Sequence, residues 1–130
     1  MLKSSVLGKF GENIAKNYIS KKGLNIIERN YHSRYGEIDI IAQINNIIAF
    51  IEVKTRKNNS IVKPVESVNK SKRNKIFKTA FTYLERNNIK FQPRFDIIEI
   101  LTKGSECEVL NINHIENAFF QEEEYAYAVF

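Results

Sequence analysis

Cysteine and histidine are scarce in this sequence of 130 residues. Cys107 is the single cysteine, which excludes an internal disulfide and fits a reducing compartment. His32 and His114 are the two histidines, and neither has a companion at metal-ligand spacing. A zinc site is therefore not expected, and each histidine is interpreted as a surface or strand residue.

Long apolar runs are also missing. No stretch approaches the roughly 18 apolar residues of a transmembrane helix, and the chain does not open on the charged and then apolar segments of a secretory leader. We expect a cytoplasmic protein without membrane contact. The length, nine Phe and six Tyr suffice for one core, which predicts a single domain over residues 1–120 and an acidic, aromatic tail over residues 121–130.

Positive charge is concentrated in two segments. Residues 1–34 carry seven bases against two acids, residues 54–94 carry twelve against two, and residues 95–130 carry one base against eight acids. This asymmetry predicts a basic face for a polyanion such as DNA, with the acidic tail kept off it. The alternative from charge alone is a solvated, lysine-rich surface.

The stretch GEIDIIAQINNIIAFIEVKTR, residues 36–56, is typical of a β-hairpin. Residues 37–43 and 47–55 form the two predicted strands, and Asn45 and Asn46 tolerate the positive φ angles of a tight turn. Apolar residues occupy both faces of these strands, which indicates a central position in a sheet covered on both sides.

The two-residue turn fixes which residues face each other across the hairpin. Asp39 falls opposite Glu52, and Lys54 follows on the same strand face. Ile38 is expected on the opposite, wholly apolar face with Ile40. Carboxylates held side by side resist ionising together, so a positive group should lie between them. It is either a divalent cation, for which oxygen ligands favour Mg²⁺ or Mn²⁺, or Lys54 in an ordinary salt-bridge patch.

These residues carry a family resemblance. Asp39 followed by Glu52-Val53-Lys54 resembles the D…ExK core of the PD-(D/E)XK nuclease superfamily. The chain as a whole is similar to the bacterial YraN endonuclease-like family, a branch related to archaeal Holliday-junction resolvases. The segments that carry the similarity are GKFGENIAKNYISKKG (residues 8–23), ERNY (28–31), GEIDIIA (36–42), FIEVKTR (50–56), the lysine of SVNKSKR (Lys70), RFDII (94–98) and INHIENAF (112–119).

The resemblance implies an α/β fold with a restriction-endonuclease-like mixed central sheet and an αβββαβ core, flanked by the first helix and a long second helix. It implies an endonuclease dependent on Mg²⁺ or Mn²⁺ that acts on DNA, including structured or branched DNA. Asp39 and Glu52 would hold the metal, and Lys54 would position the attacking hydroxide or stabilise the developing anion. Glu12 matches a first-helix glutamate that reaches the metal centre in resolvase-like relatives. Resolvases act as homodimers, which is one option for this chain.

Two amphipathic helices are predicted, at residues 8–22 and 66–87. Gly23 suits the position just after the end of the first helix. Glu12 lies at the edge of that helix's apolar face, where the alternative to a site role is an i,i+4 ion pair with Lys16.

The remaining pattern predicts strands at residues 24–33, 94–101 and 106–113, and a helical turn at residues 115–120. The helix that separates the hairpin from residues 94–101 makes a crossover, so this strand should be parallel to the second hairpin strand. Asp96 is expected to pair with Arg94 or cap a backbone group; the alternative is that it extends the acidic cluster.

Four bases are candidate contacts for DNA phosphates, namely Arg29, Arg56, Lys70 and Arg73. Arg29 has the alternative of pairing with a nearby carboxylate. Lys70 and Arg73 fall inside the apolar arc near the start of the second helix, where a cation would reach the scissile phosphate. The alternative for Lys70 is an aliphatic chain that passes the edge of the core. The polar segment at residues 57–64 is predicted to be a loop at the mouth of the site.

Two functions of different classes follow. The first is a metal-dependent phosphodiesterase that acts on DNA. The second is a nucleic-acid-binding module that keeps the nuclease scaffold without catalysis, and salt-sensitive DNA binding with no cleavage under any divalent metal would favour it. A third interpretation makes the tail a docking segment for another protein.

Overall fold

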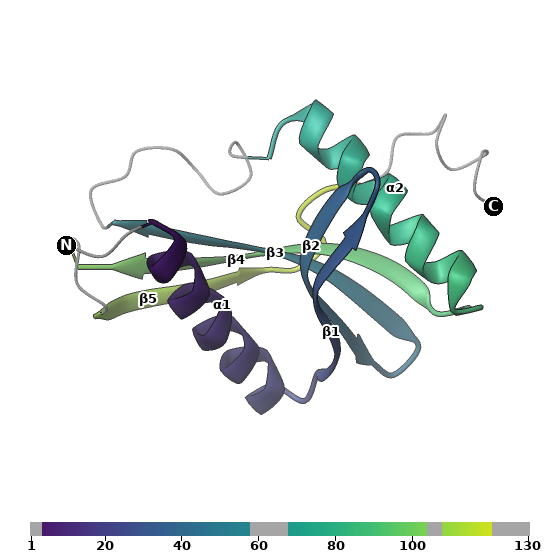
Figure 1. Ribbon diagram of the computed structural model, residues 1–130. Coiled ribbons are helices and arrows are strands. Elements are labelled where there is room, and N and C mark those ends of the chain that lie inside the picture. Colours follow the sequence, from purple (N-terminus) through teal and green to yellow (C-terminus); the bar gives the residue numbers. More distant parts are fainter. Residues whose placement is uncertain (1–3, 58–67, 104–107, 121–130) are drawn as a thin grey trace.

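The computed structural model describes residues 4–57, 68–103 and 108–120, which form an α/β fold (Figure 1). All five strands belong to one sheet in the order β1-β2-β3-β4-β5. β3 and β4 are parallel and every other neighbouring pair is antiparallel, which confirms the predicted mixed sheet. The elements in chain order are α1 (Ser4–Lys21), β1 (Asn25–Ser33), β2 (Gly36–Ile44), β3 (Ile47–Lys57), α2 (Lys70–Arg86), β4 (Gln92–Thr102) and β5 (Val109–Ile115).

Local signals in the sequence set the ends of both helices. Gly23 has a φ of 97° just after α1, as predicted for a residue that ends a helix. The side chain of Asn69 accepts a hydrogen bond of 2.9 Å from the backbone N–H of Lys72 and so caps the start of α2. No helix of the described residues is long and apolar enough to cross a membrane.

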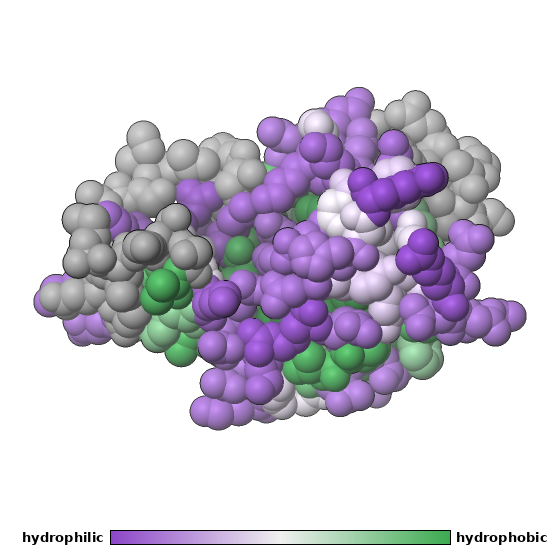
Figure 2. Space-filling model, viewed as in Figure 1, coloured by the Kyte–Doolittle hydropathy of each residue, from purple (hydrophilic) through white to green (hydrophobic). Residues whose placement is uncertain are grey.

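The two helices cover opposite faces of the sheet (Figure 1). On β3, Phe50 faces α2 and packs with Phe77, whereas Ala49 and Ile51 face the side that Ile19 of α1 covers. Residues of alternating orientation on β3 therefore serve two cores, which is why that strand is apolar on both faces. Figure 2 shows that most side chains on the visible face of the described residues are hydrophilic.

One predicted face is wrong at Ile38. This residue packs in the α2-side core with Ile41, while Ile40 packs in the α1-side core, so strict alternation breaks between them. The break lies at Asp39, and on β1 the neighbouring position is Asn30, whose φ is 53°. A left-handed residue in a strand is a local irregularity that a period-two pattern does not contain.

The segment after β5 also differs from prediction. Residues 115–120 do not form a helical segment, and only Glu116 and Asn117 make a turn. The backbone N–H of Ala118 instead donates to the carbonyl of Phe95 at 2.7 Å, and Phe119 is buried in the α2-side core. The predicted loop beyond Lys57 and the predicted tail lie outside the described residues.

Candidate active site

β2 separates from β3 at Asp39. The hairpin register runs as predicted from Ile44 opposite Ile47 to Ile40 opposite Ile51, and Asp39 and Glu52 would be the next pair. At that point the backbone N–H of Val53 donates to Asp39 Oδ2 at 2.8 Å. The carboxylate thus takes the place that a backbone carbonyl has in a regular ladder, and the sheet opens here.

Beyond Asp39, the β1–β2 hairpin approaches α2. The hydroxyl groups of Ser33 and Thr79 lie 2.9 Å apart and join the hairpin to the helix. A cavity of about 480 Å³ lies between the opened sheet and the start of α2. It is lined by Gly36, Glu37, Asp39, Glu52, Asn69, Ser71, Lys72, Lys75 and Ile76.

Two lysines converge on Glu52 from different elements. Lys72 Nζ of α2 lies 2.8 Å from Glu52 Oε1, and Lys54 Nζ of β3 lies 3.4 Å from the same oxygen. Burial lowers the pKa of Lys54, and its contact with Lys72 lowers it further. Burial opposes the charge of Lys72 too, but its contacts with Glu52 and Lys54 outweigh this and raise its pKa. Glu52 is therefore well compensated.

Asp39 lacks such compensation. Burial, and next the charge of Glu52, raise the pKa of Asp39 to about 7, although the Val53 N–H acts in the opposite direction. Glu12 and Glu37 raise it as well. Four carboxyl groups therefore repel one another around this point of the sheet, and the pKa of Asp39 stays raised although Lys72 and Lys75 line the same cavity.

Glu12 reaches this region because α1 lies directly on β3. A Cβ atom on Gly11 would overlap Thr55 Oγ1, so glycine permits this approach without a shift of the Thr55 side chain. Burial raises the pKa of Glu12, and Glu37 and Glu52 add to this rise while Arg29 opposes it. With its nitrogen toward the acids, the Asn30 carboxamide donates to Glu12 Oε1 at 2.7 Å and to Glu37 Oε1 at 3.0 Å.

Comparison with known proteins places this chain in a family. The family model described as "Uncharacterised protein family UPF0102" matches residues 11–100. The chain belongs to the UPF0102 family. A UPF0102 protein of Caldanaerobacter subterraneus is 46% identical over 114 residues, which cover 87% of this chain and 93% of that protein. A UPF0102 protein of Clostridioides difficile is 46% identical over 113 residues, 86% of this chain and 95% of that one.

This assignment confirms the resemblance to the YraN family, since UPF0102 and YraN denote one family. A UPF0102 protein of Dictyoglomus turgidum is 43% identical over 87% of this chain and 96% of its own length. The similarity therefore covers nearly the whole of each relative and includes the segment with Asp39, Glu52 and Lys54.

The donor atoms in this UPF0102 chain fit a hard divalent cation. Within the described ranges, no three Asp, Glu, His or Cys side chains form a ready-made metal cluster. Asp39 and Glu52 nevertheless line one cavity, and the pKa of Asp39 is raised by burial first and next by the charge of Glu52, which a cation would offset. An oxygen donor set with excess negative charge suits Mg²⁺ or Mn²⁺ and not zinc.

Arg29 and Arg56, which the sequence predicts to contact phosphate, have partners inside the protein. Arg56 Nε lies 3.2 Å from Glu99 Oε2, and both side chains are nearly buried. Arg29 donates to Asn13 Oδ1 at 2.8 Å and acts on the Glu12 carboxylate, in line with its alternative interpretation. These arginines brace the α1 side and the β3–β4 pair in this structure.

Lys70 and Arg73, the two bases on α2 predicted to contact phosphate, have different surroundings. Arg73 Nε donates to the Val68 carbonyl at 2.7 Å, and its guanidinium lies 5.5 Å from the centre of the Phe119 ring. Lys70 is exposed at the first residue of the helix and does not line the cavity with Asp39. The cations of α2 that line this cavity are Lys72 and Lys75, which sequence analysis left unassigned.

The sequence does contain a signal for Lys72. Asn69 is a strong N-cap residue, and a helix that starts at Lys70 places Lys72 in its first turn beside the strand ends. A helix predicted to start at residue 66 does not place Lys72 in its first turn, so the position of Lys72 beside the strand ends was not predicted. The long lysine side chain also reaches past the edge of the apolar arc.

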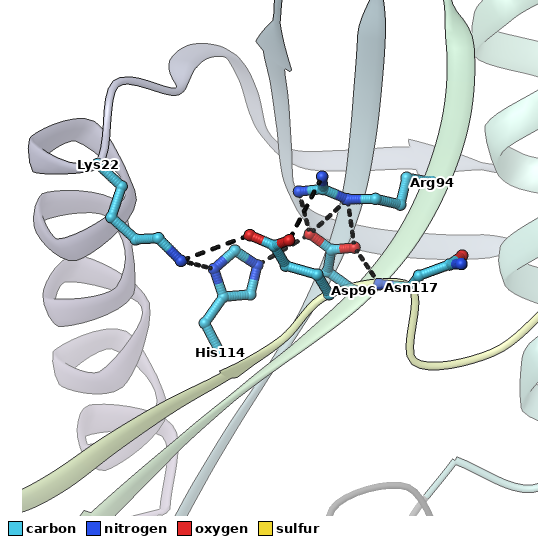
Figure 3. A network of polar contacts seen from close by, with 6 residues as sticks. Lys22, Arg94, Asp96, His114 and Asn117 are labelled. Carbon is cyan, nitrogen blue, oxygen red and sulfur yellow. Dashed lines mark hydrogen bonds and ion pairs between the residues drawn. The ribbon is translucent and has the colours of Figure 1, made fainter.

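Asp96 does not extend the acidic cluster (Figure 3). Its side chain is fully buried and accepts hydrogen bonds from Arg94 Nε at 2.9 Å, His114 Nε2 at 2.8 Å and the Asn117 backbone N–H at 2.9 Å. Burial would raise the pKa of Asp96, but these bonds, with that of His114 foremost, lower it. The prediction that Asp96 pairs with Arg94 or caps a backbone group is confirmed on both counts.

Proposed function

We propose that this protein is a metal-dependent endonuclease that hydrolyses phosphodiester bonds in DNA, with structured or branched DNA as its candidate substrate. One observation carries the proposal: Asp39, Glu52 and Lys72 line a single cavity, and Lys54 Nζ lies 3.4 Å from Glu52 Oε1. A site for phosphodiester hydrolysis needs oxygen ligands for a cation together with positive groups for the phosphate.

Asp39 and Glu52 would hold Mg²⁺ or Mn²⁺, with the Val53 carbonyl and Glu12 as further oxygen donors. When bound, the ion lowers the pKa of a coordinated water and offsets charge on the phosphate. The hydrogen bond from the Val53 N–H fixes the Asp39 carboxylate in the cavity wall, so this ligand is oriented before any cation arrives.

The lysines would act on the phosphate and the nucleophile. Lys54 follows Glu52 by two residues, so both side chains project from one face of β3. Because burial lowers its pKa, Lys54 Nζ releases a proton more readily than an exposed amine and can position an attacking hydroxide. Lys72 keeps its charge and would pair with a non-bridging phosphate oxygen as that oxygen becomes more negative.

Cleavage of supercoiled plasmid and of a four-way DNA junction, with Mg²⁺ or Mn²⁺, tests the proposal. Asp39→Asn keeps an oxygen that can accept from the Val53 N–H, and Lys54→Ala removes only the amine and its aliphatic chain. We expect each to reduce cleavage at least roughly a hundredfold with the fold intact by circular dichroism. Glu108→Gln and Lys103→Ala, at exposed positions, are the matched controls. Cutting at the wild-type rate in Asp39→Asn or Lys54→Ala would refute the assignment.

A second candidate is a DNA-binding module without catalysis. It is favoured by the contact of 2.8 Å between Lys72 and Glu52, because this ion pair already neutralises one of the two proposed metal ligands. DNA binding that weakens with salt, together with no cleavage under any divalent metal, would establish this alternative.

A further inference from the structure

A row of three lysines follows one side of α2 away from the candidate active site. Lys72 and Lys75 line the cavity with Asp39 and Glu52, and Lys78 comes three residues later. Residues three apart lie next to each other on a helix surface, about 4.5 Å apart along its axis. Lys72, Lys75 and Lys78, here called the lysine row, thus extend the positive charge from the cavity along the helix.

The turn between β1 and β2 faces this row. Lys78 Nζ lies 5.5 Å from the centre of the Tyr35 ring, and the guanidinium of Arg34 lies 4.9 Å from the same centre. Arg34 Nη2 also donates to the Tyr35 hydroxyl at 2.6 Å. One aromatic ring therefore holds a cation from the hairpin and a cation from the helix at the same place.

A second cavity of about 430 Å³ continues the path beyond Tyr35. It is lined by Ser33, Arg34, Tyr35, Thr82, Glu85 and Arg86. Both cavities lie between α2 and the hairpin, with the contact of Lys78 and Tyr35 beside them, and together they are here called the α2–hairpin groove. The face in Figure 2 is largely hydrophilic over these two elements.

The cations of this groove come from two elements, the β1–β2 turn and α2, and gather around Tyr35. Among the described residues, Lys75, Lys78, Arg34 and Arg86 make no ion pair with a carboxylate, and Glu85 is the one acid that lines the second cavity. Four cations that lie along one path and make no ion pair there favour a polyanion that follows the groove.

We infer that the α2–hairpin groove holds the sugar-phosphate backbone of one DNA strand next to the phosphate bound in the Asp39 and Glu52 cavity. The inference rests on the proposed function for the nature of this ligand. Lys75 and Lys78 contact successive phosphates, and Tyr35 acts as a positioning residue that holds Arg34 and Lys78 toward the strand. These contacts carry no base information, so binding is independent of sequence.

Binding of a fluorescein-labelled oligonucleotide, measured by anisotropy in EDTA at several salt concentrations, tests this inference without cleavage. The pair Lys75→Ala/Lys78→Ala is compared with Lys21→Ala/Lys103→Ala, which removes two exposed lysines elsewhere. Each phosphate contact contributes about 0.7 to 0.9 to the slope of log affinity against log salt. We expect the first pair to lower this slope by roughly 1.4 to 1.8 and the affinity at least roughly tenfold, and the control pair to change neither.

Equal losses of DNA affinity in the two double variants, or no loss in Lys75→Ala/Lys78→Ala, would overturn the inference that the α2–hairpin groove binds DNA. Tyr35 supplies a second test because Tyr35→Phe keeps the ring over Lys78 and Tyr35→Ala removes it. The inference requires a larger loss of binding in Tyr35→Ala than in Tyr35→Phe, and equal binding would count against it. Cleavage by the wild-type protein is scored separately, so a protein that binds through Lys75 and Lys78 but never cuts retains the groove and loses the proposed activity.

Discussion

Asp39 and Asp96 flank β3 on its two sides and differ in their partners. Asp96 is enclosed by Arg94, His114 and the Asn117 N–H, and its pKa is lowered. Asp39 has the Val53 N–H and three other carboxylates around it, and its pKa is raised to about 7. The lesson is that burial alone does not distinguish a structural acid from a functional one. An acid whose partners neutralise it stabilises the fold, whereas an acid among like charges is suited to bind a cation.

The same substitution at both positions makes this comparison testable. Asp96→Asn should lower the free energy of unfolding by about 3–5 kcal/mol, because it leaves the nearly buried Arg94 without its charged partner. Urea denaturation at pH 7 measures this loss. A loss under about 1 kcal/mol would mean that Arg94 finds a new partner, with Glu116 at 3.8 Å the nearest candidate.

Asp96 should also account for part of the acid limb of the stability profile. Because its folded pKa is lowered, its contribution is complete above the unfolded value of about 4 and is lost as pH falls through the folded pKa. The difference in unfolding free energy between wild type and Asp96→Asn should therefore be constant above about pH 5 and shrink on further acidification. A difference that stayed constant to about pH 2 would contradict this account.

Asp39→Asn should raise the free energy of unfolding, whereas Asp96→Asn should lower it. The folded pKa of about 7 lies above the unfolded value, so the wild type loses stability as pH rises from about 4 to about 7 and no further above that. Without divalent metal, the variant should exceed the wild type at pH 8 by at most about 4 kcal/mol, and this excess should vanish below about pH 4. Urea denaturation across pH measures it, and a destabilised variant at pH 8 would contradict the pKa assignment.

Addition of divalent metal gives a second test of Asp39→Asn. Mg²⁺ in the millimolar range should raise the melting temperature of the wild type, because an ion that binds only the folded state stabilises it. It should have little effect on Asp39→Asn and its full effect on Lys22→Ala, where the substitution lies in the other network. Equal shifts in the wild type and Asp39→Asn would place the ion elsewhere.

Lys22 gives the smallest expected effect. Its Nζ lies 2.9 Å from His114 Nδ1 and 3.6 Å from Glu116, at the exposed rim of the Asp96 network. Since an ammonium group only donates, Nδ1 accepts and Nε2 carries the proton toward Asp96. Lys22→Ala should cost less than about 1 kcal/mol, and nitrogen NMR of His114 should still show the Nε2–H tautomer. A switch to Nδ1–H would show that Lys22 controls the tautomer.

Much of this arrangement could be predicted from the sequence because it depends on local spacing. The Asn45-Asn46 turn set the hairpin register as far as Ile40, and the crossover length made β4 parallel to β3. Asp39 and Glu52 come directly after the last pair of that register, and both line one cavity, although they do not form the predicted ladder pair. Their catalytic and metal-binding roles stay predictions.

The features that could not be predicted from the sequence depend on contacts between segments that are distant in the chain. Ile38 changes face because Asn30 and Asp39 interrupt the alternation, and this irregularity depends on the packing of the hairpin against α2. The partners of Arg56 and Arg73 come from β4 and from the segment after β5, which no helical or strand period within their own segments could indicate. The role of Lys72 depends on where α2 starts.

At Gly11, α1 lies so close to β3 that the Thr55 side chain occupies the space of a Cβ atom. With Ala15 and Ile19 buried against the same face, this close packing sets the height of Glu12 above the sheet, and helix and strand should shift together. The opposite wall is joined by two hydroxyls, the Tyr35 ring and flexible lysine side chains. Any adjustment to an incoming substrate should therefore occur on that wall, while the side of the site that carries Glu12 stays fixed.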